Sequence, residues 1–91
     1  MDEAPNPHLR EAILEVVSNQ LRDGNPPETR ATLERLMAEG HSRDEAIRQI
    51  GCVVSCEIFE VLKSKRPFDE ARFVAALHAL PRMPWEIEGD A

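Results

Sequence analysis

Several residue types are scarce in this chain of 91 residues. It has no Tyr, one Trp, three Phe and only four Gly. It contains no glycine-rich loop of the kind that binds phosphate groups. No apolar run approaches the roughly 20 residues that a membrane-spanning helix needs. The first residues, MDEAPNPHLRE, have neither the basic start nor the apolar segment of a signal peptide. We therefore expect a cytoplasmic protein that does not bind a membrane.

Basic residues are also in the minority. Eleven Lys and Arg stand against seventeen Asp and Glu, which gives a net charge of −6. Nucleic-acid affinity depends mainly on neutralising phosphates with basic side chains, so a polyanion would be repelled on average. A local basic patch is still compatible with this balance, for example at Lys63, Lys65 and Arg66. The composition predicts that nucleic acid is not a partner.

The apolar pattern predicts an all-α fold, because the chain lacks an alternation long enough for a strand. Four helices are expected, one starting at Pro7 and ending before DGNPP, and others at about 27–39, 42–66 and 69–80. Residues 1–91 are expected to form a single domain. It would be a compact four-helix bundle over about 6–80 with an extended C-terminal tail over 81–91, which Pro81 and Pro84 interrupt.

Local signals mark the helix ends. Asn6 is a candidate N-cap, and Ser42 with Glu45 has the spacing of a capping box. Gly40 suits a left-handed C-cap. The third helix is expected at the centre, since its apolar stripe runs over about five turns and Val53 and Phe59 widen it. The stripe comprises Ala46, Ile47, Ile50, Val54, Ile58, Val61 and Leu62.

Two cysteines, Cys52 and Cys56, lie four residues apart on this helix. The favoured interpretation is packing, since free cysteine is among the most buried residue types. Zinc binding is the second, because two thiolates on one helix face make half of a four-ligand site. The candidate further ligands are His8, His41 and His78. A redox role is the third interpretation, although Cys52 lies too far from the helix start for the dipole to lower its pKa.

Gly51 precedes the first cysteine and costs helix stability relative to alanine. We expect it, with Ser55, to form a strip of small residues against which a neighbouring helix packs. No nucleophile elbow or catalytic motif is present, and the carboxylates of RDEAIR and FDEAR fall at helix starts where they favour capping. We expect no enzyme activity, no catalytic residue and no cofactor other than the zinc alternative.

The supply of apolar residues is large for so small a core. Leu14, Val17, Val53 and Trp85 are the candidates for a surface that binds a protein partner or a second copy of the chain. The alternative is that all four pack within the monomer. The leading hypothesis is thus a non-enzymatic interaction module, and the other is a metal- or redox-responsive protein that uses Cys52 and Cys56.

Three segments, NPHLREAILEVVSNQL, PPETRATLERLMAEGHSRDEAIRQIG and FDEARFVAALHALP, cover roughly residues 6–80. They resemble a bacterial helical family known as domain of unknown function number 1841. The resemblance rests on the order of the helices and on the short motifs NP…NQL and DEA. The resemblance implies no activity. In that family Asn-Pro is followed by a His-x-x-x-His pair, and the long helix begins with another.

The matching positions here are Arg10 and Leu14, then Asp44 and Arg48. If the family binds a metal through its histidines, this chain is a scaffold that has lost the site. An ion pair of Asp44 with Arg10 or Arg48 across the first and third helices would then replace the metal.

Overall fold

A computed structural model describes residues 7–89, and within that range the chain is helical without strands. The predicted all-α class is confirmed, whereas Asn6 and its capping role lie outside the described residues. None of the helices within 7–89 has the length and apolar character needed to traverse a bilayer. The five helices are α1 (Pro7–Asp23), α2 (Pro27–Ala38), α3 (Arg43–Ser64), α4 (Glu70–Ala79) and α5 (Pro84–Gly89).

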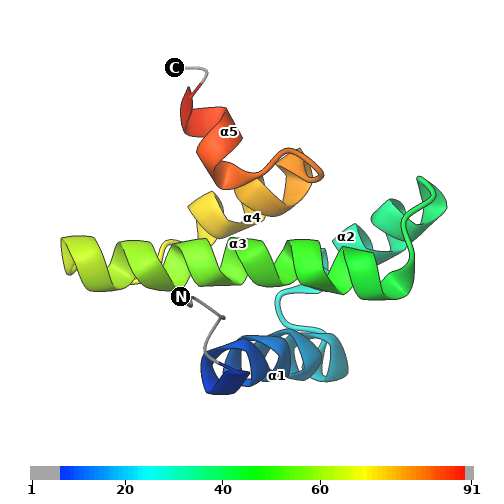
Figure 1. Ribbon diagram of the computed structural model, residues 1–91, viewed down its shortest axis with the longest axis horizontal. Coiled ribbons are helices and arrows are strands. Elements are labelled where there is room, and N and C mark those ends of the chain that lie inside the picture. Colours follow the sequence, from blue (N-terminus) through cyan, green and yellow to red (C-terminus); the bar gives the residue numbers. More distant parts are fainter. Residues whose placement is uncertain (1–6, 90–91) are drawn as a thin grey trace.

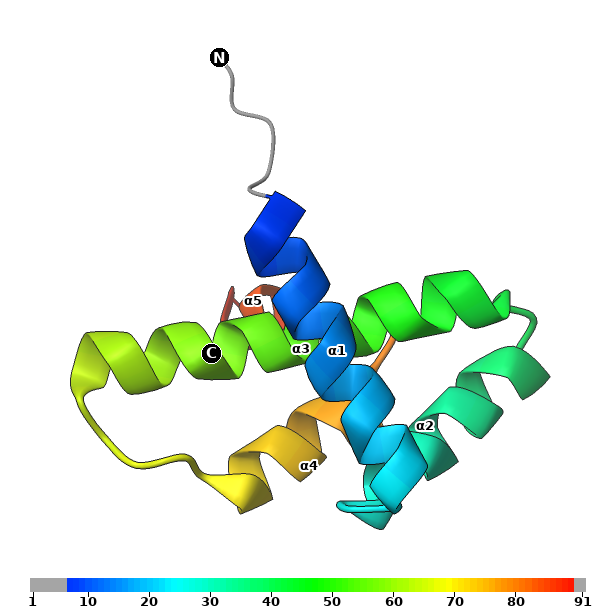
Figure 2. The same cartoon turned by 90° about the horizontal axis from the view of Figure 1, so that it is seen from below.

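Helix α3 lies at the centre of the molecule, and α1, α2 and α4 all pack against it (Figure 1). Its 22 residues make it the longest of the described helices. Helix α1 crosses α3 steeply near its middle instead of running alongside it (Figure 2). The expectation of a central third helix therefore holds, but the arrangement is not a bundle of aligned helices.

The core is drawn from four helices and from the residue that follows α4. Val17 and Val53, which the sequence offered as surplus apolar residues for an interaction surface, belong to it and are 0% and 1% exposed. Their assignment to an interaction surface is wrong, because both lie inside the core that α1, α2, α3 and α4 form together. The core consists of Val17, Leu21, Leu33, Leu36, Ala46, Ile50, Val53, Val54, Phe73, Leu77 and Leu80.

Hydrogen bonds explain where α2 ends and where α3 begins. The backbone N–H of His41 donates to the carbonyl of Leu36 at 3.1 Å, and that of Gly40 donates to Met37 at 3.1 Å. This is the Schellman pattern, with Gly40 at a φ of 107°. The capping box of Ser42 and Glu45 is present in both directions. Both predictions are confirmed.

The end of the chain differs from the predicted extended tail, since residues 84–89 form α5. Pro84 occupies the first helical position, where its missing N–H is not needed. The carboxylate of Glu86 accepts a hydrogen bond of 2.9 Å from the backbone N–H of Met83, which satisfies one donor of the new helix. The sequence PWE carries this local signal, and the predicted extended tail is not confirmed.

Candidate interaction surface

A groove lies between α3, α4 and α5. It has a volume of about 830 Å³. Ala75, Ala76 and Ala79 line it from α4, so small side chains make room between the helices. We call it the α3–α5 groove. Its remaining lining residues are Val53, Ser55, Cys56, Glu57, Phe59, Glu60, Lys63, Arg72, Arg82, Pro84 and Trp85.

Two large aromatic side chains border the α3–α5 groove and remain exposed to solvent. Phe59 of α3 is 63% exposed and Trp85 of α5 is 57% exposed. The ammonium group of Lys63 lies 6.0 Å from the centroid of the Phe59 ring, within the range of a cation–π contact. The exposure of Trp85 agrees with its predicted place on an interaction surface. Phe59, by contrast, was expected to widen the buried face of α3.

A second cavity, of about 370 Å³, lies on the other flank of α3 toward α1 and α4. Ile58, Leu62 and Phe68 line it and are themselves exposed, Leu62 by 71%. The rings of Phe68 and Phe73 meet at a centroid distance of 5.7 Å, which connects the loop before α4 to the core. Apolar surface therefore continues across the C-terminal half of α3 from one flank to the other.

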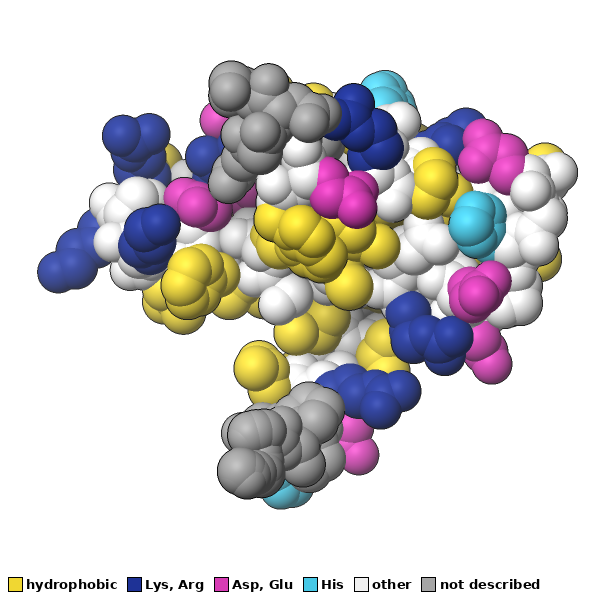
Figure 3. Space-filling view, turned by 45° about the horizontal axis from the view of Figure 1, so that its top comes forward, with side chains coloured by type: hydrophobic (Ala, Val, Ile, Leu, Met, Phe, Trp, Pro, Cys, Tyr) yellow, Lys and Arg dark blue, Asp and Glu magenta, His cyan; other side chains and the backbone are white. Residues whose placement is uncertain are grey.

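We call the exposed side chains Ile58, Phe59 and Leu62 the apolar ridge. The ridge exists because α1 crosses α3 at one place only, near its middle, where Ile13 lies over Gly51. Beyond that crossing no described helix covers the outer side of α3 (Figure 1). Figure 3 shows hydrophobic side chains beside basic ones at the end of the molecule where α3 finishes.

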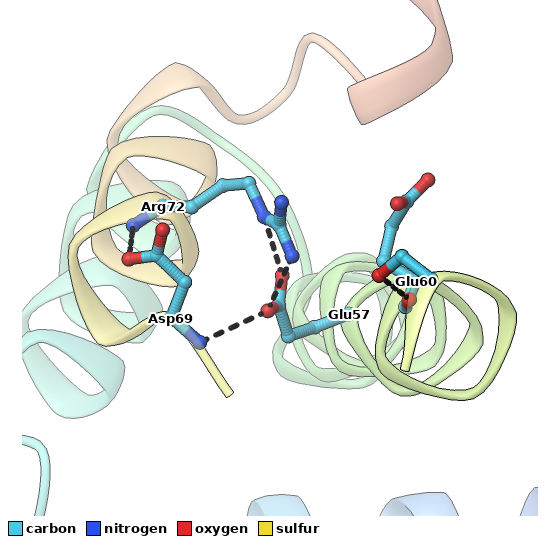
Figure 4. A network of polar contacts seen from close by, with 5 residues as sticks. Glu57, Glu60, Asp69 and Arg72 are labelled. Atoms are coloured by element: carbon cyan, nitrogen blue, oxygen red, sulfur yellow. Dashed lines mark hydrogen bonds and ion pairs between the residues drawn. The ribbon is translucent and has the colours of Figure 1, made fainter. Parts of the chain in front are cut away.

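A charged network beneath the ridge fixes α3 to the start of α4 (Figure 4). Arg72 donates two hydrogen bonds to the carboxylate of Glu57, from Nε at 3.1 Å and from an Nη at 2.9 Å. The backbone N–H of Asp69 donates to the same carboxylate at 3.3 Å. In turn the side chain of Asp69 accepts from the backbone N–H of Arg72 and caps α4.

The Arg72 guanidinium of this network stays protonated at physiological pH. The hydrogen bonds to Glu57 raise the pKa of the Arg72 guanidinium above its ordinary value. A raised pKa contributes stability at every pH below the unfolded pKa and loses it only above that value. The guanidinium therefore remains protonated, and the position of α4 relative to α3 does not depend on its titration.

Neither cysteine is fully buried, so the prediction that both pack within the core needs correction. Cys52 and Cys56 are each half-buried, and neither forms a disulfide. Cys56 lines the α3–α5 groove, whereas Cys52 lines a third cavity, of about 360 Å³, between α1 and α3. Their four-residue spacing thus brings them to the edges of two different hollows.

The three histidines do not complete a metal site with these thiols. His8 is in the first turn of α1, His78 is exposed on α4, and Nδ1 of His41 lies 3.2 Å from Nε2 of Gln49. Within residues 7–89, no group of three His, Cys, Asp or Glu side chains is placed to hold a metal ion. The fold separates these candidate ligands instead of gathering them.

The proposed ion pair across α1 and α3 is not formed. Arg10, Leu14 and Arg48 do line the third cavity together, so the two helices meet where the resemblance suggested. Yet among the described ion pairs none joins Asp44 to Arg10 or Arg48. Leu14, the remaining candidate for an interaction surface, is half-buried and lines this cavity between α1 and α3.

Comparison with protein-family models, with curated proteins and with solved structures finds no match to this chain. The resemblance to domain of unknown function number 1841 therefore stays a prediction.

Proposed function

We propose that the protein is a non-enzymatic cytoplasmic interaction module that binds another polypeptide along the apolar ridge and the adjoining α3–α5 groove. The observation that supports the proposal is the exposure of Phe59, Leu62 and Trp85 around one continuous region. Scattered exposed apolar residues are normal, but a contiguous group of large ones is typical of a binding surface.

The composition of the region fits a protein interface. Interfaces combine a few large apolar or aromatic anchors with a polar border, and the anchors supply most of the binding free energy. Phe59, Leu62 and Trp85 provide such anchors. Glu60, Lys63 and Arg82 line the same groove and provide charged groups at its border.

The network of Glu57 and Arg72 supports the surface from below. By fixing α4 relative to α3, it holds open the space that the small side chains of α4 leave. A surface held in its binding geometry loses less conformational entropy on association. The alternatives of a metal- or redox-responsive protein and of a scaffold that has lost a metal site have no comparable support in the arrangement of their residues.

Site-specific photo-crosslinking tests the proposal. Phe59 is replaced by a benzoylphenylalanine, and the protein is irradiated in cells that naturally contain it. Position 34 on α2, an exposed Glu in the native chain, is the matched control. We expect a discrete adduct from position 59 and none from position 34. An additional Leu62→Glu substitution should remove the adduct, and the absence of a discrete adduct from position 59 would contradict the proposal.

A further inference from the structure

We propose that the polypeptide bound at the apolar ridge is a second copy of this chain, with the two α3 helices antiparallel. The inference rests on the proposed function, since it names the occupant of the same surface. It is carried by the placement of two oppositely charged residues, Glu60 and Lys63, beside the ridge.

The apolar residues of the ridge are compatible with two-fold pairing. Phe59 and Leu62 lie three residues apart, and residues at this spacing share one helix face. A two-fold axis perpendicular to α3, passing near residue 61, places Phe59 of each copy against Leu62 of the other. Symmetric interfaces repeat each contact in this way, because residue i meets j and j meets i.

The charges select the antiparallel direction. Glu60 and Lys63 both line the α3–α5 groove, so they lie on the same flank of the ridge. When two helices pair antiparallel, equivalent flanks face each other and the sequence runs in opposite directions. Glu60 of each copy then faces Lys63 of the other, which makes two opposite-charge pairs. A parallel two-fold pair would put the equivalent flanks on opposite sides of the interface, so Glu60 and Lys63 would form no charge pair across it.

The length of the uncovered helix also fits. Helix α1 covers the outer side of α3 as far as the cavity lined by Gly51, Cys52 and Ser55. From there to the end of α3 at Ser64 about two and a half turns remain, at 3.6 residues per turn. An antiparallel partner centred near residue 61 overlaps this stretch and ends before it reaches α1.

The net charge of −6 on each chain opposes association at long range. At physiological ionic strength the Debye length is about 8 Å, so this general repulsion is largely screened while close pairs retain their effect. The dimer should therefore be measured at that ionic strength. Its free energy would come chiefly from the apolar ridge, and its direction from Glu60 and Lys63.

Sedimentation equilibrium of the full chain over a hundredfold range of concentration is the test. The variants are Leu62→Glu, Glu60→Lys, Lys63→Glu and the exchange of both charges, with Glu34→Lys as the control on α2. Circular dichroism confirms that each variant keeps its helices. Trp85, the single tryptophan, reports on its own surroundings through its fluorescence.

We expect the wild-type chain and Glu34→Lys to dimerise. Leu62→Glu should weaken dimerisation at least about a hundredfold, because a two-fold interface loses the anchor from both copies. Each single charge reversal should weaken it about tenfold, because two pairs become repulsive. The double exchange restores both pairs, leaves the net charge at −6, and should regain the wild-type dissociation constant. Tryptophan emission should shift to shorter wavelength as the dimer forms.

A wild-type chain that stays monomeric at every concentration would overturn the inference. So would a double exchange no better than the single reversals, which would exclude the antiparallel charge pairing. These failures are distinguishable from failure of the proposed function. A monomeric chain whose position 59 still gives a discrete, Leu62-dependent adduct has a different protein as its partner, whereas a monomeric chain with no adduct has neither.

Discussion

The carboxylate of Glu57, on the buried side of α3, accepts two hydrogen bonds from the Arg72 guanidinium. Nε donates at 3.1 Å and Nη2 donates at 2.9 Å. Glu57 is 8% exposed at its side chain, whereas Arg72 reaches solvent. A buried carboxylate is tolerated when its oxygens accept hydrogen bonds, and here the backbone N–H of Asp69 supplies a third. The pair therefore connects two helices at a position where apolar packing would be the default.

Replacing Glu57 with Gln tests how much this connection stabilises the fold. The amide keeps the size of the side chain but loses the charge, so at least one charge-assisted bond is replaced by a weaker one. We expect the free energy of unfolding to fall by about 1–2 kcal/mol in urea denaturation. Glu34→Gln, at an exposed position on α2, is the control and should change it by less than about 0.5 kcal/mol. Equal losses in the two variants would contradict the assigned role.

Gly51→Ala should stabilise the protein. A methyl group built at Gly51 would lie 3.5 Å from Cγ2 of Ile13, an ordinary van der Waals distance. We expect the change to stabilise the helix by about 0.5–1 kcal/mol, because alanine loses less backbone conformational entropy on folding than glycine does. Thermal unfolding monitored by circular dichroism would show a higher midpoint. Gly51→Leu is the contrasting variant and should destabilise, since the added branches collide with α1.

Lys65→Gly should also stabilise the protein. Lys65 ends α3 in the left-handed conformation, with a φ of 58°. A residue with a Cβ pays about 1–2 kcal/mol for this conformation, and glycine avoids the cost while gaining entropy when unfolded. We expect a net gain of about 0.5–1 kcal/mol in the free energy of unfolding. Arg66→Gly, at the next position, serves as the control, and a gain there of the same size would argue against the conformational explanation.

The cysteines give a prediction that separates packing from metal binding. Because Cys52 and Cys56 are half-buried, both thiols should react with a thiol reagent in the native protein, but more slowly than after denaturation. Because the fold does not gather further ligands around them, added zinc should leave the unfolding midpoint unchanged. A midpoint that rises with zinc and loses this rise in Cys52→Ala would support the metal hypothesis over packing.

Local signals explain why the helices were predictable. The capping box of Ser42 and Glu45 and the left-handed Gly40 act through backbone groups only a few residues away, so the sequence places them without knowledge of the rest of the fold. The signal for α5, in Pro84 and Glu86, is just as local, although Pro81 and Pro84 favour the prediction of an extended tail.

The surface was less predictable, because it depends on how helices cross. Periodicity shows that α3 is apolar over a wide arc, but it does not show which part of that arc a neighbour will cover. Val53 and Phe59 both looked like additions to the stripe, yet one is buried and the other exposed. Glu57 gave a signal of its own, as a charge within the apolar arc, but its partner Arg72 lies fifteen residues away on another helix.

The sequence by itself determined that this chain is helical, where most of its helices begin and end, and that the third helix is central. Only the tertiary structure decided that α1 crosses α3 steeply, which buries Val17 and Val53 and leaves Phe59 and Leu62 uncovered. The physical reason is that caps and periodicity are properties of neighbouring residues, whereas a crossing angle follows from the fit of many side chains on both helices at once.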